Sequence, residues 1–317
     1  MHSVLGVGTN RMNIYTVRRA AADLAQYVCE GGEEAKTRGV VIAYDTRHFS
    51  KEFAVETAKV LGAYGRDRLG VAVRNGQSYE LLTGNQLRAL LLNYILQTKQ
   101  SNGTLPENGV MIKTIVTSEL GAKIAAYYGV ETVNTVTGFK YIAEKIAEYE
   151  QSGAYKYLFG YEESYGYLIE TFVRDKDAVQ VALKVAEMAS FYELHGKTLL
   201  DALEDVYKQF GYYKEALISK VFEGKSGQEE MAAMLDTVRQ NPPTEIAGKK
   251  VVLFEDYLTA TATAITGDKL PIDLSKENVL KFILEDESWV AIRPSGTEPK
   301  CKYYFGVTGE SAGQASE

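Results

Sequence analysis

The chain has 317 residues, of which 45% are hydrophobic and 24% are charged, and its formal net charge is −7. This is an ordinary globular composition, and the length favours two domains because single cores rarely grow beyond about 250 residues. A net negative charge does not suggest the clustered basic surface that binds nucleic acid. No apolar run approaches the roughly 18 residues that cross a membrane, and the first residues lack the pattern of a signal peptide. We therefore expect a soluble, cytoplasmic protein with neither nucleic acid nor a membrane as its partner.

The sequence contains two cysteines, Cys29 and Cys301, and they are far apart in the chain. Without a Cys-x-x-Cys spacing, they suggest neither a disulfide framework nor a zinc site. We expect two reduced thiols.

The first part of the chain alternates between helical and strand patterns. Apolar residues recur at helical spacing over 17–29, and Gly31-Gly32 ends this helix. A run rich in β-branched residues at 39–45 predicts a strand, which a polar turn joins to a helical pattern at 51–65. The same alternation predicts strands at 69–73, 79–82, 109–116, 129–134 and 155–159 and helices at 85–97 and 119–128. Strands separated by helices of 10 to 15 residues predict a mostly parallel α/β sheet.

A long helical stretch at about 175–210 then leads to a second part of the chain. There, a helix is expected around 228–239, and Pro242-Pro243 ends it. Strand patterns follow at 249–265, 278–286 and 288–307. One helix followed by several strands predicts a small α+β domain.

The strongest chemical motif is Arg-Pro-Ser-Gly-Thr-Glu-Pro-Lys at 293–300, between two alternating strand patterns. Arg293 offers a planar fork suited to two phosphate oxygens, and Ser295 and Thr297 offer hydroxyl donors. Gly296 lets backbone N–H groups approach an anion closely. These residues predict a phosphate site, although a hairpin turn of the same composition is the alternative.

A second motif is Phe-Gly-Tyr-Glu-Glu-Ser-Tyr-Gly-Tyr-Leu at 159–168, at the end of an apolar strand. Open α/β sheets bind their ligands at this end of their strands. The adjacent carboxylates of Glu162 and Glu163, with Ser164, can exchange hydrogen bonds with sugar hydroxyls. A solvated turn is the alternative interpretation.

Two weaker signals lie at the starts of predicted helices. Thr137 and Gly138 precede a helical pattern, and the free N–H groups at such a position bind anions. Thr-Gly is equally common at a helix N-terminus without any ligand. The segment 45–48, Asp-Thr-Arg-His, follows a predicted strand and indicates either an active-site turn or a helix cap.

Five of these segments together resemble the α-D-phosphohexomutase family of bacterial phosphoglucomutases and phosphomannomutases. They are Ala-Tyr-Asp-Thr-Arg-His at 43–48, Asp-Arg-Leu-Gly-Val-Ala-Val at 67–73, Thr-Val-Thr-Gly-Phe-Lys at 135–140, Gly-Tyr-Glu-Glu-Ser-Tyr-Gly at 160–166 and the motif at 293–300. That family moves a phosphoryl group between the 1 and 6 positions of a hexose through a phosphoserine, with Mg²⁺ nearby. Three similar α/β domains and a smaller α+β domain form its active-site cleft.

The resemblance implies a hexose phosphate as the ligand and assigns roles to individual residues. Glu162 and Ser164 would hold the sugar hydroxyls, and the motif at 293–300 would grip the phosphate that is not transferred. Tyr161 stands where many members of the family have Gly. The implied substrate-binding residues are Arg68, Thr137, Gly138, Glu162, Ser164, Arg293, Ser295, Gly296 and Thr297.

Two departures from the family bear on catalysis. The family's phosphoserine loop resembles Thr-Ala-Ser-His-Asn-Pro, and this string is absent from the 317 residues, so we expect no catalytic residue. The family's metal loop runs Asp-x-Asp-x-Asp-Arg, of which only Asp67-Arg68 remains. Asp67 would be a single remnant ligand, and one carboxylate is a poor Mg²⁺ site.

Asp67-Arg68 follows almost directly on the helix predicted at 51–65, which suggests that an intervening segment of the family's sequence is missing. The family's opening Gly-Thr-x-Gly-Leu-Arg strand is also absent, which suggests a truncated N-terminus. We expect remnants of domain 1 at 1–65 and of domain 3 at 66–190, followed by a phosphate-binding α+β domain at 191–317. The segment 39–65 would complete a hybrid α/β unit with a mixed or parallel sheet of phosphohexomutase type.

The departures favour a family member that is inactive or severely impaired. A non-catalytic phosphosugar-binding protein or partner subunit of a full-length mutase, and a deletion product without function, are the alternatives.

Overall fold

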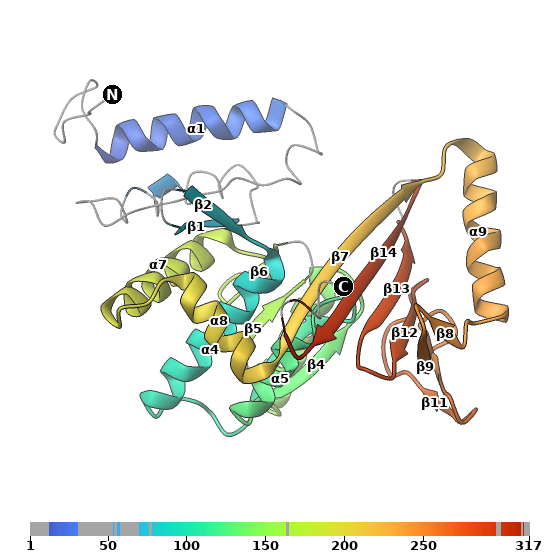
Figure 1. Ribbon diagram of the computed structural model, residues 1–317. Helices are drawn as coiled ribbons and strands as arrows, with labels where there is room; N and C mark the ends of the chain where they lie inside the picture. The colour runs from blue at the N-terminus through green and yellow to red at the C-terminus, as the bar shows by residue number, and fades with distance from the viewer. Residues whose placement is uncertain are drawn as a thin grey trace. The chain divides into compact units, whose positions relative to one another are not determined.

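The computed structural model describes residues 13–30, 53, 56–57, 70–75, 78–162, 165–295, 299–311 and 313 (Figure 1). The predicted strand at 39–45 and most of the predicted helix at 51–65 lie outside these residues, and so does the expected hybrid unit. The chain forms two compact units. The first comprises 1–114, 121–134 and 138–206, and the second comprises 115–120, 135–137 and 207–317.

Helix α1, Ile14–Glu30, confirms the helix predicted at 17–29. Asn13 caps it, because its Oδ1 accepts hydrogen bonds from the backbone N–H groups of Tyr15 and Thr16 at 3.0 and 3.1 Å. Arg18 on this helix donates from Nε to Oε2 of the buried Glu56 at 2.6 Å. The helix is therefore tied to a residue far along the chain.

Strands β1, Val71–Asn75, and β2, Ser78–Leu82, form an antiparallel hairpin. Among the described strands they pair only with each other, and this pairing is antiparallel, not the parallel pairing expected from the alternation. Two residues separate them, whereas a parallel pair needs a crossover of a dozen or more. Helix α4, Gly84–Ser101, follows directly.

The main sheet of the first unit is mixed, with strand order β4-β3-β5-β6. Its strands are β3 Gly109–Thr114, β4 Glu131–Thr135, β5 Lys156–Tyr161 and β6 Tyr167–Leu168. β3 pairs parallel with β5, and β5 pairs antiparallel with β6. Every residue of β3 is buried, as expected for a strand covered on both faces. The predicted α/β class with a mixed or parallel sheet is confirmed.

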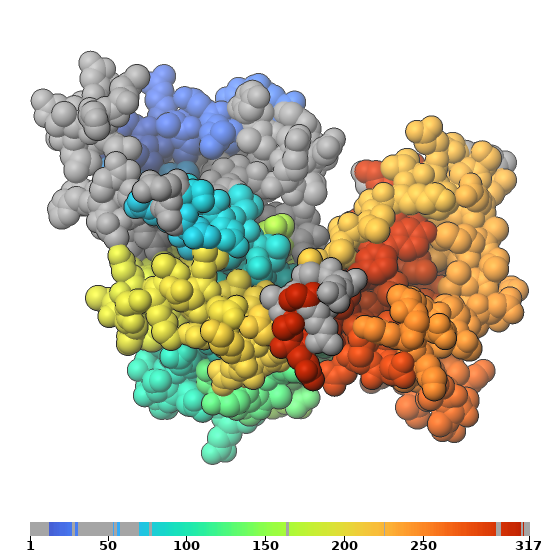
Figure 2. Space-filling view, in the orientation of Figure 1, coloured from blue at the N-terminus to red at the C-terminus, as the bar shows by residue number. Residues whose placement is uncertain are grey.

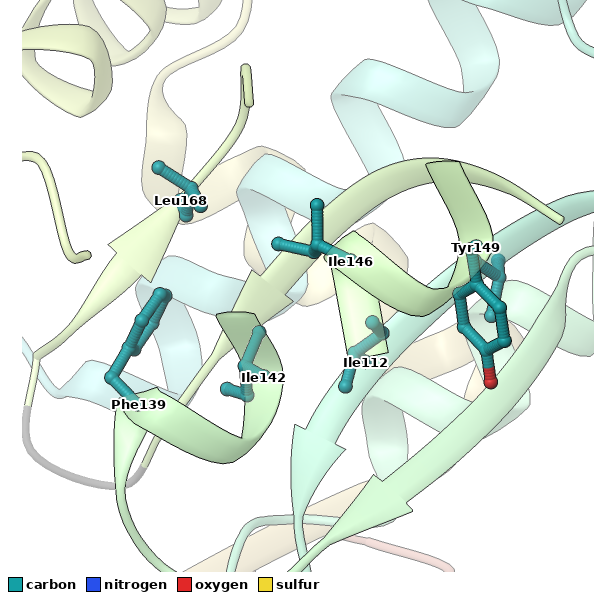
Figure 3. Close-up of a cluster of buried hydrophobic side chains, with 7 residues drawn as sticks. Ile112, Phe139, Ile142, Ile146, Tyr149 and Leu168 are labelled. Atoms are coloured by element: carbon teal, nitrogen blue, oxygen red, sulfur yellow. The ribbon is translucent and has the colours of Figure 1, made fainter. Parts of the chain in front are cut away.

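Helices α5, Leu120–Tyr127, and α6, Phe139–Ser152, follow β3 and β4. The inner face of α6 carries Phe139, Ile142, Ile146 and Tyr149, which are buried with Ile112 of β3 (Figure 3). These α6 positions are three or four residues apart and so lie on one side of the helix. Their burial attaches α6 to the sheet.

The helical stretch expected at 175–210 is two helices, α7 Ala178–Leu194 and α8 Leu199–Phe210. Gly196, with a φ of +71°, takes the left-handed conformation that ends a helix. Asp201 then accepts hydrogen bonds from both the N–H and the hydroxyl of Thr198, which starts α8. The two compact units divide within α8, later in the chain than the division expected at 190/191.

The second unit contains an antiparallel sheet and helix α9, Gly224–Gln240. The strand order is β11-β10-β9-β12-β13-β14-β7, and β8 pairs with β9. The bounds are β7 Tyr212–Val221, β8 Glu245–Ile246, β9 Lys249–Asp256, β10 Thr261–Ala264, β11 Lys269–Pro271, β12 Leu280–Leu284, β13 Trp289–Pro294 and β14 Lys300–Gly309. This arrangement confirms the predicted α+β class of the C-terminal part.

Helix α9 covers the sheet through a narrow apolar stripe. Leu235 is buried with Val251, Leu280, Phe282 and Leu284 of β9 and β12. The remaining side chains of α9 are mostly exposed, and Figure 2 shows this helix (light orange) at the molecular surface. No helix within the described ranges is both long enough and apolar enough to cross a bilayer.

Candidate functional site

The loop that follows β5 holds Glu162 in a buried position. Its backbone N–H donates to the carbonyl of Gly166 at 3.1 Å, so both ends of this loop are hydrogen-bonded to each other. A side chain at Gly166 would collide with Cγ of Glu162, 2.9 Å from the ideal Cβ position, and with Cδ of Lys176. A larger residue at this position would therefore have to displace the Glu162 and Lys176 side chains. Ser164, the other residue expected to bind the sugar, lies outside the described residues.

Lys176 supplies a cation beside this loop, and sequence reasoning missed it. Its Nζ lies 3.9 Å from Oε1 of Glu162 and 3.0 Å from Oδ1 of Asp175, and only 14% of its side chain is exposed. The ammonium also lies 5.6 Å from the ring centre of Phe139. A lysine in a charged stretch is usually solvated, so no local pattern indicates that Lys176 is buried beside Glu162.

The loop between β4 and α6 contains Thr137 and Gly138. Gly138 lies at the predicted helix start, with a φ of +123° that disfavours other residues. The buried Thr137 donates from its hydroxyl to Oε2 of Glu277 at 3.0 Å, a contact within the second unit. Thr137 is thus engaged with a carboxylate in this structure.

Arg293 and Ser295 lie in the hairpin that joins β13 to β14. The backbone N–H of Ser295 donates to the carbonyl of Lys300 at 2.8 Å. Arg293 extends from β13, and its Nε lies 3.6 Å from Oε2 of Glu277. The two strands are paired antiparallel on both sides of this connection, and a phosphate role for it stays a prediction. Gly296 and Thr297 lie outside the described residues.

Glu277 is the second residue that sequence reasoning missed. Its carboxylate receives the hydroxyl of Thr137 and faces the guanidinium of Arg293, so two predicted site residues meet at one oxygen. Glu277 belongs to no motif and lies in a polar stretch before β12. Only the folded structure shows that Glu277 contacts Thr137 and Arg293.

Asp67 and Arg68, the remnant of the metal loop, lie outside the described residues. Within the described ranges, no three His, Cys, Asp or Glu side chains are grouped so that they could hold a metal ion. Asp67 as a ligand and Arg68 as a substrate-binding residue both stay predictions.

The fold defines an α/β protein with a mixed sheet in one unit and an antiparallel sheet in the other. Three sequence models of one family match successive parts of this chain. Residues 3–77 match the phosphoglucomutase/phosphomannomutase alpha/beta/alpha domain I, residues 83–210 match alpha/beta/alpha domain III, and residues 248–315 match the C-terminal domain. The chain therefore belongs to the phosphoglucomutase/phosphomannomutase family of α-D-phosphohexomutases.

Curated relatives agree with this assignment. A phosphoglucomutase of Staphylococcus aureus (strain MRSA252) is 44% identical over 244 residues, which cover 76% of this chain and 43% of the relative. The phosphoglucomutase of Staphylococcus haemolyticus is 40% identical over 254 residues, which cover 79% and 45%. This chain thus spans less than half the length of these relatives.

A solved structure shares the fold. It is the open form of the exocytosis-sensitive phosphoprotein pp63/parafusin, a phosphoglucomutase from Paramecium, with a TM-score of 0.54 and 17% identity. The match covers 78% of this chain and 42% of that one. At this identity the likeness concerns the fold alone.

Proposed function

We propose that this chain is a phosphohexomutase-family protein that binds hexose phosphates but does not transfer their phosphoryl group. Family membership supports the ligand class, and the single observation that carries the proposal is the buried Glu162 with Lys176 beside it. A carboxylate in that setting is held as a fixed acceptor for sugar hydroxyls. With Ser164 it forms the proposed sugar-binding loop.

The hairpin at 293–300 is the proposed phosphate-binding element. Arg293, partly exposed on β13, offers charge-assisted hydrogen bonds, and Ser295, Gly296 and Thr297 would supply further donors. Thr137, Gly138 and Arg68 are proposed as additional substrate contacts. Three or four such bonds at about 1.5 to 3 kcal/mol each, less several kcal/mol for immobilising the ligand, give a dissociation constant of roughly millimolar to micromolar.

Catalysis is proposed to be absent because the chain lacks the phosphoserine loop. A mutase divides its reaction into two phosphoryl transfers through a covalent intermediate, which needs a nucleophile. The donor set for Mg²⁺ does not fit either, because Asp67 is the one acidic residue left of three in the metal loop. We therefore propose no step that uses a metal.

The remaining features of the proposal concern the organisation of the protein. They are the domain remnants at 1–65, 66–190 and 191–317, the internally missing segment, and a cytoplasmic location. Association with a full-length mutase is a further proposal, and co-purification would test it.

Isothermal titration with glucose 6-phosphate tests the binding proposal. We expect heat of binding from the wild-type chain and at least tenfold weaker binding from Glu162→Gln and from Arg293→Met. Glu144→Gln and Arg19→Met, at exposed positions with the same change of chemistry, are the matched controls. No heat at tens of millimolar ligand would contradict binding. Measurable conversion of glucose 1-phosphate by the purified chain would contradict the absence of catalysis.

A further inference from the structure

Helix α4 carries an arginine in its buried face. Arg88 is 3% exposed and lies among leucines and other apolar residues of that helix. Burying a guanidinium is costly unless its N–H groups find acceptors. Within the described ranges, the acceptors of its N–H groups are neutral oxygen atoms.

Those acceptors join α4 to the proposed sugar-binding loop. Nε donates to the carbonyl of Gly84 at 2.9 Å, and Nη2 donates to Oδ1 of Asn85. Nη1 donates to the backbone carbonyl of Glu162 at 2.7 Å, across 74 positions of sequence. One end of the fork is thus anchored in its own helix, and the other holds the residue proposed to bind the sugar.

Tyr161 completes this arrangement. Its fully buried ring lies with its centre 5.1 Å from Cζ of Arg88, which is the distance of a cation–π contact. The ring also lies 5.5 Å from that of Phe159, and its hydroxyl is packed against Gly121. Many family members have Gly where this chain has Tyr161. The ring that Tyr161 adds is buried against Arg88.

We infer that Arg88 is a positioning residue for the sugar-binding loop, acting through the Glu162 carbonyl and the Tyr161 ring. A guanidinium suits this role because its planar fork can donate in several fixed directions and stack on a ring at the same time. A lysine has no such fork. The inference rests on the proposed function for its effect on ligands, and on geometry alone for its effect on the loop.

Hydrogen exchange followed by mass spectrometry tests the geometry without any ligand. In Arg88→Met, amides of 159–162 and 165–168 should exchange at least tenfold faster, because the Glu162 carbonyl loses the donor that anchors it to α4. Arg88→Lys keeps the buried charge and the aliphatic stem and should give an intermediate increase. Arg174→Met removes an exposed arginine, paired with Glu150 at 3.0 and 2.5 Å, and should leave these amides unchanged.

Ligand binding provides a second measurement. If Arg88 only stabilised the fold, its replacement would not weaken the binding of one ligand selectively. The affinity of Arg88→Lys for glucose 6-phosphate should fall about tenfold, while its affinity for inorganic phosphate stays within twofold of wild type. Equal losses for both ligands, or unchanged exchange at 159–162 and 165–168 in both variants, would overturn the inference. If the wild-type chain binds neither ligand, the proposed function fails, and the exchange data alone still decide the role of Arg88.

Discussion

The Nε atom of Arg293 lies 3.6 Å from the carboxylate Oε2 of Glu277. That oxygen also accepts the hydroxyl of Thr137 at 3.0 Å. The arginine proposed to bind phosphate therefore already faces an anionic oxygen, and an incoming phosphate must share it with Glu277 or displace that carboxylate.

Replacing Glu277 by Gln should tighten the binding of inorganic phosphate. The amide oxygen can still accept from Thr137, but the competing negative charge beside Arg293 is removed. Because both side chains are partly exposed, we expect a gain of only about threefold to tenfold, or about 1 kcal/mol. Titration calorimetry at low salt measures it. Glu245→Gln, an exposed change of equal charge, controls for net charge, and equal or weaker binding by Glu277→Gln would refute the competition.

Replacing Gly121 by Ala should destabilise the first unit. A Cβ on this α5 residue would overlap the buried hydroxyl of Tyr161. Overpacking of this kind costs about 1 to 3 kcal/mol, which outweighs the gain of about 1 kcal/mol from alanine in a helix. Urea denaturation gives the free energy of unfolding. Gly84→Ala is the control, since its nearest neighbour lies 3.5 Å away. A Gly121→Ala variant more stable than wild type would contradict this prediction and show that the Tyr161 ring can shift to make room for the methyl group.

The capping box of α4 should contribute about 1 kcal/mol to the free energy of unfolding. Thr83 Oγ1 accepts from the backbone N–H of Gln86 at 3.2 Å, and the Gln86 side chain accepts from the N–H of Thr83 at 2.8 Å. Thr83→Ala removes the first of these bonds and exposes a helix donor. Thermal unfolding should show a lower melting temperature than for Ser101→Ala, an exposed change in the last turn of the same helix. Equal melting temperatures would mean that the cap is dispensable.

Asp286 should stabilise the second unit only above acidic pH. Burial raises the pKa of its carboxyl, but hydrogen bonds from Lys249 and from the hydroxyl and N–H of Ser288 outweigh burial and hold that pKa below its ordinary value. A lowered pKa in the folded state stabilises the fold at every pH above the unfolded-state pKa of about 3.9. The contribution is lost as pH falls through the lower folded-state value.

The pH dependence of Asp286→Asn checks this sign. At pH 7 the variant should be less stable than wild type by no more than about 1 kcal/mol, because a partly exposed pair is screened by water. The difference should shrink below about pH 4. Denaturant titrations at pH 7 and pH 3 measure both values, with the exposed Asp23→Asn as control. A difference that grows on acidification would contradict the assignment.

The regular elements were accessible to sequence reasoning because local periodicity encodes them. The apolar spacing of α1 and α6 and the alternation along β13 and β14 each follow from which face must be buried. The sequence pattern predicted one continuous helical stretch where the structure has α7 and α8. Gly196, which ends α7, and the Thr198–Asp201 pair, which starts α8, indicate the break. The hairpin of β1 and β2 was also misjudged, because a pattern of strands does not state which strands pair.

Sequence by itself determined the family and the two motifs proposed to bind a ligand, because contiguous residues carry those signals. Tertiary structure alone decided how the charges are arranged around them. Arg88 reaches Glu162 over 74 positions, and Thr137 reaches Glu277 over 140. Whether a charged side chain is solvated or buried against such a partner depends on the folded backbone, since burial makes an unpaired charge too costly to keep. Local sequence carries no information about that partner.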